Sequence, residues 1–370
     1  METRAAVLFE SPGRWEVCDL ELDGPSDGEA LVRVVASGVC RTDVHYMHGR
    51  AAALPMCGGH EGAGIVEAVG RGVTTVEPGD HVVMSFIPSC GHCRYCASGR
   101  QNLCNVGAIL GRGRQLDGTY RMHHHDVDVS QFMMISTFAA WTTVNERSLV
   151  KVPDDLPLDT ICLLACGVGT GFGSAIHAAE VEPGDVVIVM GVGGVGINAV
   201  QGASLAGAST VVAVDPLPFK REMAGRLGAT HAFADMVEAT DFVRSVTDGQ
   251  GADSAIVTTD TVTGDHIAQA FEAIGKGATV VVTGMALGGQ STGIPIDLLM
   301  LTGYQKRIQG CLYGMGNPSV EILREVDLYR SGRLKLDELV TARYALDEID
   351  VAVDDLLRGQ NIRGVIVHEH

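Results

Sequence analysis

Four thiols stand close together in the stretch CGHCRYCASGRQNLC, at Cys90, Cys93, Cys96 and Cys104. Disulfide bonds and a metal ion are the two interpretations of this spacing. Four thiolates can enclose one zinc ion tetrahedrally, with Zn–S bonds of about 2.3 Å, and short C-x-x-C steps let one loop wrap around the metal. A site that four protein ligands close performs no chemistry, so this interpretation predicts a structural zinc.

The expected compartment favours metal over disulfides. The N-terminus, METRAAVLFESPGRWEV, carries charges at Glu2 and Arg4 and has no long apolar core, so it is typical of neither a secretory signal nor a transit peptide. No run approaches the roughly 18 to 20 apolar residues of a membrane helix. We therefore expect a cytoplasmic protein, in which thiols stay reduced and clustered cysteines bind metal.

Composition limits the other partners. With 370 residues, 46% hydrophobic content and 47 glycines, the chain is long enough for two compact domains. Its 27 basic and 45 acidic residues give a net charge of 27 − 45 = −18, which repels phosphate backbones and anionic lipids. We expect neither a nucleic acid nor a membrane as partner.

A second set of metal-binding side chains is spread along the chain. GVCRTDVH contains Cys40, GGHEGAG contains His60 and LACGVGTGFG contains Cys166. One imidazole and two thiolates would hold a zinc ion on three sides and leave the fourth position open, as a catalytic zinc requires. Taken singly, Cys166 is as well explained by core packing, and His60 by a capped turn.

A glycine loop predicts a dinucleotide site. Gly191, Gly193 and Gly196 of GVGGVG, with Gly194 and Val195 between them, follow an apolar strand and open a helix. The backbone can then approach a pyrophosphate at the positive end of that helix. Asp215, at the end of the next strand, would accept hydrogen bonds from a ribose diol and repel a 2′-phosphate, which favours NAD over NADP. A tight strand-to-helix turn without a ligand is the alternative.

The surrounding pattern predicts two kinds of fold. Up to about residue 165, short β-type runs between Gly, Pro and Asp turns favour an antiparallel or barrel-like sheet. From about residue 185, apolar strands alternate with helical stretches, which indicates a parallel sheet with helices on both faces. PSVEILREVDLYRSG is typical of a helix, and we expect NIRGVIVHEH to be a closing strand that returns to the first domain.

Taken in order and spacing, these motifs resemble the zinc-dependent medium-chain alcohol dehydrogenases. The segment CRYCASGRQNLCNVGAILGRGRQLDGTYR is most similar to the actinobacterial nicotinoprotein branch, which is assayed with N,N-dimethyl-4-nitrosoaniline. The resemblance implies an α/β chain with a GroES-like, β-rich catalytic domain at 1–167, completed by 313–370 and carrying the structural zinc lobe at 90–104. It implies a Rossmann, doubly wound NAD-binding domain at 168–312.

The resemblance also implies roles for single residues. Cys40, His60 and Cys166 match the catalytic zinc ligands, and the four clustered cysteines match the structural ones. A proton relay would run from the substrate to Thr42, through the cofactor ribose, to His45 at the surface. Asp43 would orient the His60 ring, and Glu61 would sit beside the metal. Three cations match cofactor contacts: Arg41 and Arg363 at the pyrophosphate, and Lys220 near the adenosine ribose.

The implied activity is reversible oxidation of primary alcohols to aldehydes by hydride transfer to NAD, with two zinc ions per chain. In the nicotinoprotein branch NAD(H) stays bound through turnover. The family further implies a homo-oligomer, a dimer or a tetramer. One alternative is a thiol-dependent formaldehyde dehydrogenase, in which Arg112, Arg114 and Arg121 would bind the carboxylate of a thiol adduct. Another is a non-catalytic NAD-binding protein.

Two further groups receive no role in chemistry. We assign Cys18, Cys57, Cys162 and Cys311 to packing. The run from His123 to His125 has no Cys or carboxylate partner at ligand spacing, so we expect it to be a solvated loop.

Overall fold

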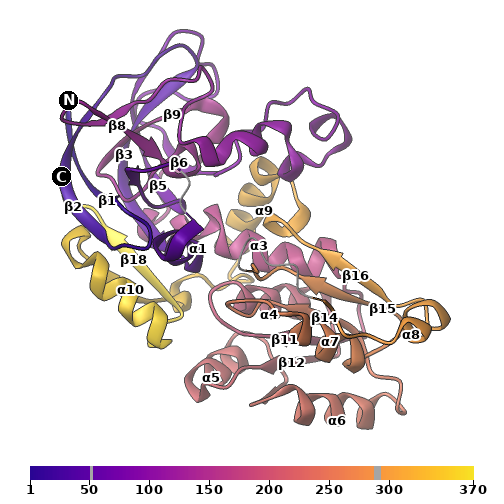
Figure 1. Ribbon diagram of the computed structural model, residues 1–370. Helices are drawn as coiled ribbons and strands as arrows, with labels where there is room; N and C mark the ends of the chain where they lie inside the picture. The colour runs from indigo at the N-terminus through magenta and orange to yellow at the C-terminus, as the bar shows by residue number, and fades with distance from the viewer. Residues whose placement is uncertain (51–52, 287–292) are drawn as a thin grey trace. The chain divides into compact units, whose positions relative to one another are not determined.

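The computed structural model describes residues 1–50, 53–286 and 293–370, and they form two compact units (Figure 1). Met1–Cys166 and Asn317–His370 make up the first unit, and Gly167–Gly316 the second. The first segment of the first unit thus ends one residue before the expected 167, and the second unit ends at 316 instead of 312.

The first unit combines a closed barrel with a larger sheet. The barrel runs in the order β1-β2-β7-β8-β4, and the sheet in the order β10-β6-β5-β3-β18-β17, with β9 paired to β3. The barrel strands are β1 (Glu2–Leu8), β2 (Trp15–Leu22), β4 (Met56–Cys57), β7 (Met122–His124) and β8 (Val127–Gln131). The sheet strands are β3 (Glu29–Val39), β5 (Gly62–Val69), β6 (His81–Met84), β9 (Trp141–Asn145), β10 (Leu149–Val152), β17 (Val340–Tyr344) and β18 (Arg363–Val367).

Alternating side chains explain the barrel. In β1 the small and apolar residues Ala5 and Val7 point into a core that also contains Leu20, Leu22, Met122 and Val129. The C-terminal strand β18 pairs antiparallel with β3, from Gly364 opposite Val39 to Val367 opposite Ala36. The predicted return of the chain end to the first domain is therefore confirmed.

The first unit also contains four α-helices among its described residues. They are α1 (Arg41–His45), α2 (Leu158–Ile161), α9 (Pro318–Arg330) and α10 (Ile349–Arg358). Helix α9 has Asn317 as its N-cap, whose side chain accepts from the Ser319 N–H, and Pro318 at the first helical position. These local signals explain why the helix predicted from PSVEILREVDLYRSG begins where it does.

The second unit is a doubly wound parallel sheet. Its six strands run in the order β13-β12-β11-β14-β15-β16, and every pairing is parallel. The strands are β11 (Val186–Met190), β12 (Thr210–Val214), β13 (His231–Phe233), β14 (Ala252–Val257), β15 (Ile274–Val282) and β16 (Arg307–Gly310). The helices are α3 (Gly167–Gly173), α4 (Gly196–Ala206), α5 (Pro218–Arg226), α6 (Met236–Val246), α7 (Gly264–Ala273) and α8 (Leu298–Gly303). The central strand β11 is buried along its whole length, as expected for a parallel strand covered on both faces.

The histidine run differs from its predicted loop. His123 and His124 lie in β7, where they pair with Asp128 and Val127 of β8. The His123 ring bridges two carboxylates, with Nδ1 3.0 Å from Asp128 and Nε2 3.3 Å from Asp23. The sequence pattern does not indicate strand β7, because this short strand forms by pairing with β2 and β8 of the barrel.

Within 1–50, 53–286 and 293–370, no single helix is long and apolar enough to cross a membrane. One bent pair, Leu158–Ala165 with Gly167–Ala178, meets the criterion by length and composition alone, and most of its residues are buried.

Candidate active site

The three predicted ligands of the second cluster come together in the first unit. Ligand atoms of Cys40, His60, Cys166 and also Glu61 all lie within 4.8 Å of one another, and all four residues are buried. Cys40 is the N-cap of α1, directly after β3, whereas His60 and Glu61 immediately precede β5. Cys166 follows the short helical turn Cys162–Ala165 after α2 and is the last residue of the first segment of the first unit. Three distant segments thus supply one set of soft donors.

Asp43 orients the imidazole in this cluster. Its Oδ1 lies 3.0 Å from Nδ1 of His60, and its Oδ2 accepts the backbone N–H of Cys40 at 2.9 Å. The other ring nitrogen, Nε2 of His60, is buried and has no hydrogen-bond partner among the described residues. A buried nitrogen without a partner beside two thiols fits a metal ion, since His ligands of zinc usually hold a carboxylate on their other nitrogen.

The electrostatics of the cluster favour a cation. A hydrogen bond from Cys166, with His60 and Arg363 nearby, lowers the pKa of Cys40 well below its usual value. That same bond, together with burial, raises the pKa of Cys166 well above its usual value. A divalent cation held by these side chains would stabilise both sulfurs as thiolates.

The carboxylate of Glu61 has Arg363 as its charged partner. The two side chains form an ion pair, and they are 0% and 3% exposed. Burial raises the pKa of Glu61 to about 7, although the guanidinium opposes this shift. Sequence reasoning assigned Arg363 to the cofactor pyrophosphate and did not foresee this pair, because 302 residues separate its members. Nε of Arg363 has no hydrogen-bond partner within the described part of the chain.

The two residues predicted to form the proton relay lie on α1. The Cys40 thiol lies 3.7 Å from the Thr42 hydroxyl, so Thr42 borders the cluster directly. His45 is the last residue of α1 and is only 6% exposed. The expectation that His45 lies at the surface is therefore wrong for the described structure.

The four clustered cysteines form a compact second set of donors. Their sulfur atoms lie within 4.8 Å of one another, and Sγ of Cys90 is 3.9 Å from Sγ of Cys96. A disulfide needs about 2.05 Å, whereas the edge of a tetrahedron with Zn–S bonds of 2.3 Å is about 3.8 Å. Backbone N–H groups of Cys93 and Cys96 point at the sulfurs of Cys90 and Cys93, at 3.3 and 3.5 Å. All ten cysteines are free, and this set fits one enclosed zinc ion.

The glycine loop lies at the carboxyl end of β11 in the second unit. Gly191 follows β11, and Gly196 opens the eleven-residue helix α4. A Cβ on Gly196 would lie 1.9 Å from the Gly191 carbonyl oxygen, so only glycine permits this turn. A Cβ on Gly193 would meet nothing closer than Nζ of Lys220 at 3.7 Å. The loop leaves open space at a helix N-terminus, which fits a pyrophosphate.

Asp215 connects this loop with the next strand. It is 5% exposed, and its carboxylate accepts the N–H groups of Val192 at 3.1 Å and Leu217 at 2.9 Å. Lys220, on α5, places its ammonium beside Gly193 as described above. Strand order reverses between β11 and β14, the point at which ligands bind in such sheets. Arg41 lies in the other unit, as the first residue of α1.

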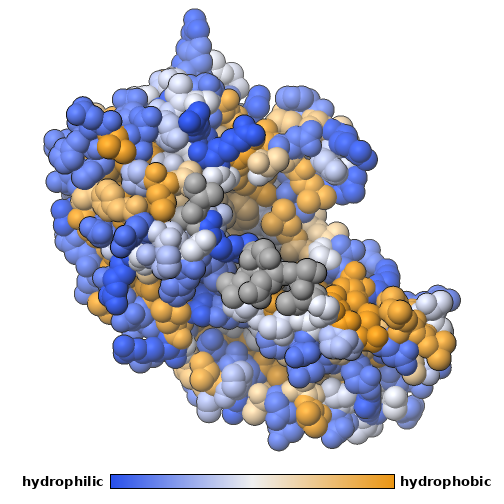
Figure 2. Space-filling view, viewed as in Figure 1, coloured by the Kyte–Doolittle hydropathy of each residue, from blue (hydrophilic) through white to orange (hydrophobic). Residues whose placement is uncertain are grey.

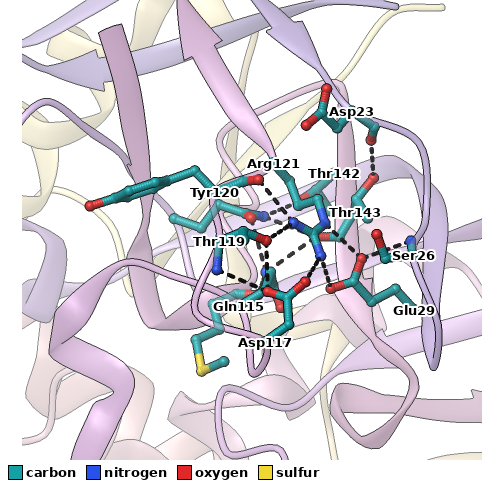
Figure 3. Close-up of polar contacts among 12 residues, drawn as sticks. Asp23, Ser26, Glu29, Gln115, Asp117, Thr119, Tyr120, Arg121, Thr142 and Thr143 are labelled. Carbon is teal, nitrogen blue, oxygen red and sulfur yellow. Dashed lines mark hydrogen bonds and ion pairs between the residues drawn. The ribbon is translucent and has the colours of Figure 1, made fainter.

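The predicted cationic pocket is not present at Arg121. Its guanidinium is 4% exposed and forms a double ion pair with Glu29 at 2.8 and 2.9 Å, and it donates to Asp117 at 2.6 Å (Figure 3). Arg114 lies over the Tyr120 ring and donates to its hydroxyl at 3.1 Å. Arg121 is thus neutralised inside the fold, whereas Arg112 and Arg114 are exposed and Arg114 contacts Tyr120.

Comparison with known proteins agrees with this geometry. Residues 26–154 match the alcohol dehydrogenase GroES-like domain, and residues 194–327 match the zinc-binding dehydrogenase domain. The chain is 49% identical over 369 residues to the NDMA-dependent alcohol dehydrogenase of Amycolatopsis methanolica, covering 100% of this chain and 99% of that one. The chain belongs to the zinc-binding alcohol dehydrogenase family. The predicted resemblance and the GroES-like plus Rossmann fold class are confirmed.

Other members of this family differ in their named substrates. Benzyl alcohol dehydrogenase from Acinetobacter calcoaceticus has a TM-score of 0.91 and 32% identity, with 100% of both chains covered. The S-(hydroxymethyl)glutathione dehydrogenase of Paracoccus denitrificans is 34% identical, again over 100% of both chains. The higher identity to the NDMA-dependent member favours the alcohol dehydrogenase assignment over the thiol-dependent one.

Proposed function

We propose that this member of the zinc-binding alcohol dehydrogenase family oxidises primary alcohols to aldehydes, reversibly, by hydride transfer to NAD. The observation that carries the proposal is the buried set of Cys40, His60 and Cys166, in which Nε2 of His60 has no partner among the described residues. Three protein ligands leave one zinc position for the substrate. Zinc, when bound, supplies Lewis acidity at the alcohol oxygen, and NAD supplies the hydride acceptor.

The chain's own residues prepare this site. Asp43 fixes the tautomer of His60, so that Nδ1 carries the proton and Nε2 keeps its lone pair for the metal. Glu61, paired with Arg363, adds a fourth donor to the set, a carboxylate oxygen that would lie beside the metal. The Thr42 hydroxyl takes the substrate proton, because one hydroxyl can both accept and donate. His45 is the base at which the relay ends, in a buried position.

The cofactor site uses the glycine loop and its neighbours. Backbone N–H groups of Gly193, Gly194 and Val195 would bind the pyrophosphate at the N-terminus of α4. Asp215 would accept the ribose diol and exclude a 2′-phosphate, and Lys220 would lie near that ribose. Arg41 and Arg363 are the further candidates for the pyrophosphate.

The lobe of Cys90, Cys93, Cys96 and Cys104 would hold the second zinc as a structural ion. Its N–H···S contacts support this role, because they stabilise thiolates already arranged around one centre.

A nicotinoprotein mode, with NAD(H) bound through turnover, fits the name of the NDMA-dependent relative. The thiol-dependent alternative has little support, since Arg121 is neutralised by Glu29 and Asp117 and cannot receive an adduct carboxylate. A non-catalytic NAD-binding protein would not need an unpartnered imidazole nitrogen between two thiols.

Assembly and compartment complete the proposal. Figure 2 shows hydrophobic side chains gathered on the second unit where α8 lies, and Leu298 and Leu299 there are 69% and 73% exposed. Such a patch supports a homo-oligomer, a dimer or a tetramer, in which a second copy covers it. Ten free cysteines support a reducing cytoplasmic location.

A screen of alcohols tests the activity. Protein purified without added nucleotide would be desalted and assayed in two arms, with free NAD and with N,N-dimethyl-4-nitrosoaniline alone. We expect turnover of primary alcohols in the nitrosoaniline arm and close to one NAD(H) per chain released on denaturation. Turnover only with added NAD would leave an ordinary alcohol dehydrogenase, and no turnover in either arm would reject the proposed activity.

A further inference from the structure

A buried segment folds back over the loop that carries His60. We call residues 132–138 the strap. The strap donates two backbone hydrogen bonds to this loop, from Thr137 N to Gly59 O and from Phe138 N to Gly58 O, both at 3.0 Å. Gly59 has φ +82°, and a Cβ there would lie 2.4 Å from the Phe138 nitrogen. The strap therefore explains why glycine precedes the histidine in GGHEG.

The strap also contacts the imidazole itself. The Phe132 ring meets the His60 ring edge-on, with centroids 5.4 Å apart and planes at 86°. Phe132 is 3% exposed and packs equally against Tyr46, at 4.5 Å between centroids. Because Asp43 fixes only the Nδ1 edge of His60, the strap restrains the ring from a second direction.

The strap is held in a conformation that its residues disfavour. Met133, Met134 and Ser136 have φ values of +50°, +64° and +46°, in the left-handed region that non-glycine residues rarely adopt. Strained backbone of this kind persists only where the surroundings impose it, and it concentrates at functional sites. The side chains that impose it are therefore candidates for a functional role.

Three side chains provide those restraints. Ser136 Oγ accepts the Phe132 N–H at 2.8 Å and donates to the Cys57 carbonyl at 2.7 Å. Thr142 Oγ1, on β9, donates to the Ile135 carbonyl at 2.6 Å. Nε2 of Gln115 donates to the Met134 carbonyl at 3.0 Å. These four bonds involve strap residues that are left-handed or adjacent to a left-handed residue.

Thr142 also joins the strap to the polar core of the first unit. Nε2 of Gln131 donates to Thr142 Oγ1 at 3.1 Å, and Oε1 of Gln131 accepts from Gln115 at 2.9 Å. Gln115 precedes Arg121, whose ion pair with Glu29 anchors this part of the chain (Figure 3). The hydroxyl of Thr142 thus accepts from one fixed group and donates to the strap.

We propose that Thr142 is a positioning residue for the metal ligand His60, acting through the strap. Its hydroxyl holds residues 132–138 in their strained form, and the strap holds Gly59 and the His60 ring in place for the metal. This inference rests on the proposed function, because it takes His60 to be a zinc ligand.

The neighbouring residue provides a matched control. Thr142 and Thr143 are both 0% exposed and lie side by side on β9. The Thr143 hydroxyl donates to the Asp23 carbonyl at 2.8 Å, away from the strap (Figure 3). Thr142→Val and Thr143→Val therefore each remove one buried hydroxyl of the same shape, and only the first touches the strap. Thr142→Ser keeps the hydroxyl and should rescue the effect.

The test measures how tightly each zinc ion is held, by competition with a chromogenic chelator on the full chain. We expect wild type, Thr143→Val and Thr142→Ser each to hold two zinc ions. The affinity of each ion should be the same in all three proteins. Thr142→Val should bind one of the two ions at least about tenfold more weakly, as is common when groups that orient a metal ligand are changed. The zinc of the cysteine lobe should be unchanged in every variant and serves as an internal reference.

If Thr142→Val and Thr143→Val hold both zinc ions with the same affinities, the inference is overturned, whatever the melting temperatures of the two variants. If Thr142→Val does not fold, Ser136→Ala takes its place in the test, because Ser136 carries the other hydroxyl that holds the strap. The same weakening of one zinc ion is expected, and unchanged zinc affinities would again overturn the inference. A wild-type chain with only one zinc ion would instead refute the proposed function, and the inference with it.

Discussion

Asp43 connects two candidate ligands of one metal ion, since its carboxylate lies 3.0 Å from Nδ1 of His60 and accepts the N–H of Cys40 at 2.9 Å. We expect Asp43→Asn to weaken the catalytic zinc by roughly 10- to 100-fold, because an amide orients the ring less firmly and lowers its basicity. Chelator competition measures this affinity. Asp27→Asn, which changes a carboxylate 65% exposed, is the control, and equal zinc retention in both variants would contradict the role of Asp43.

The cysteine lobe should contribute to stability and not to chemistry. We expect Cys93→Ser to remove one zinc ion and to lower the melting temperature, because the loop from Cys90 to Cys104 has little apolar core of its own. Metal analysis and thermal unfolding check the two effects. Cys18→Ser, a thiol outside both clusters, should change neither. A Cys93→Ser protein with two zinc ions and an unchanged melting temperature would remove the lobe's structural role.

Asp215 should decide which nucleotide the second unit accepts. Its buried carboxylate lies at the end of β12 and contacts the glycine loop through Val192. We expect Asp215→Ala to weaken NAD binding and to raise the NADP to NAD ratio of affinities by roughly tenfold or more, because a repulsive charge and an acceptor are both lost. Calorimetric titration of nucleotide-free protein measures the ratio. A ratio equal to that of wild type would take Asp215 out of the ribose site.

His368 should make the first unit sensitive to acid. Burial lowers the pKa of His368 to about 4, while its Nε2 bonds the Thr137 carbonyl at 3.0 Å and His370 lies near it. The ordinary pKa is about 6.5, so the unfolded chain takes up the proton first as pH falls. The contribution of His368 is therefore complete above about pH 6.5 and is lost toward pH 4.

At pH 5 this loss amounts to about 2 kcal/mol in the free energy of unfolding. His368→Gln keeps a donor for Thr137 and cannot be protonated, so its unfolding free energy should fall less between pH 7.5 and pH 5. Denaturant unfolding at the two pH values gives the comparison. The same decline in wild type and in the variant would show that another group titrates.

Local motifs explain most of what could be predicted from the sequence. The cysteine lobe lies within fifteen residues, and the glycine loop follows its strand directly, so spacing alone indicated both. Long-range pairings could not be predicted in this way. The Arg363–Glu61 pair joins chain ends that meet only because β18 pairs with β3.

The same limit applies to single side chains near the site. Arg121 looked like an available cation, and its burial follows from Glu29, which lies 92 residues away. His45 is expected at the surface, whereas its side chain is only 6% exposed in the structure. The strap has no signature of its own, because its left-handed residues are two methionines and a serine.

Zinc content tests the central claim most directly, because Cys40, His60 and Cys166 are proposed to hold a second metal ion besides that of the lobe. Metal analysis of zinc-replete, desalted protein would compare wild type, Cys166→Ser and Cys162→Ser. Cys162 is a matched control, since it is buried four residues before Cys166 and lies outside both clusters. We predict two zinc ions per chain in wild type and Cys162→Ser, and one in Cys166→Ser with turnover nearly abolished. One zinc ion in wild type, or two in Cys166→Ser, would contradict the account.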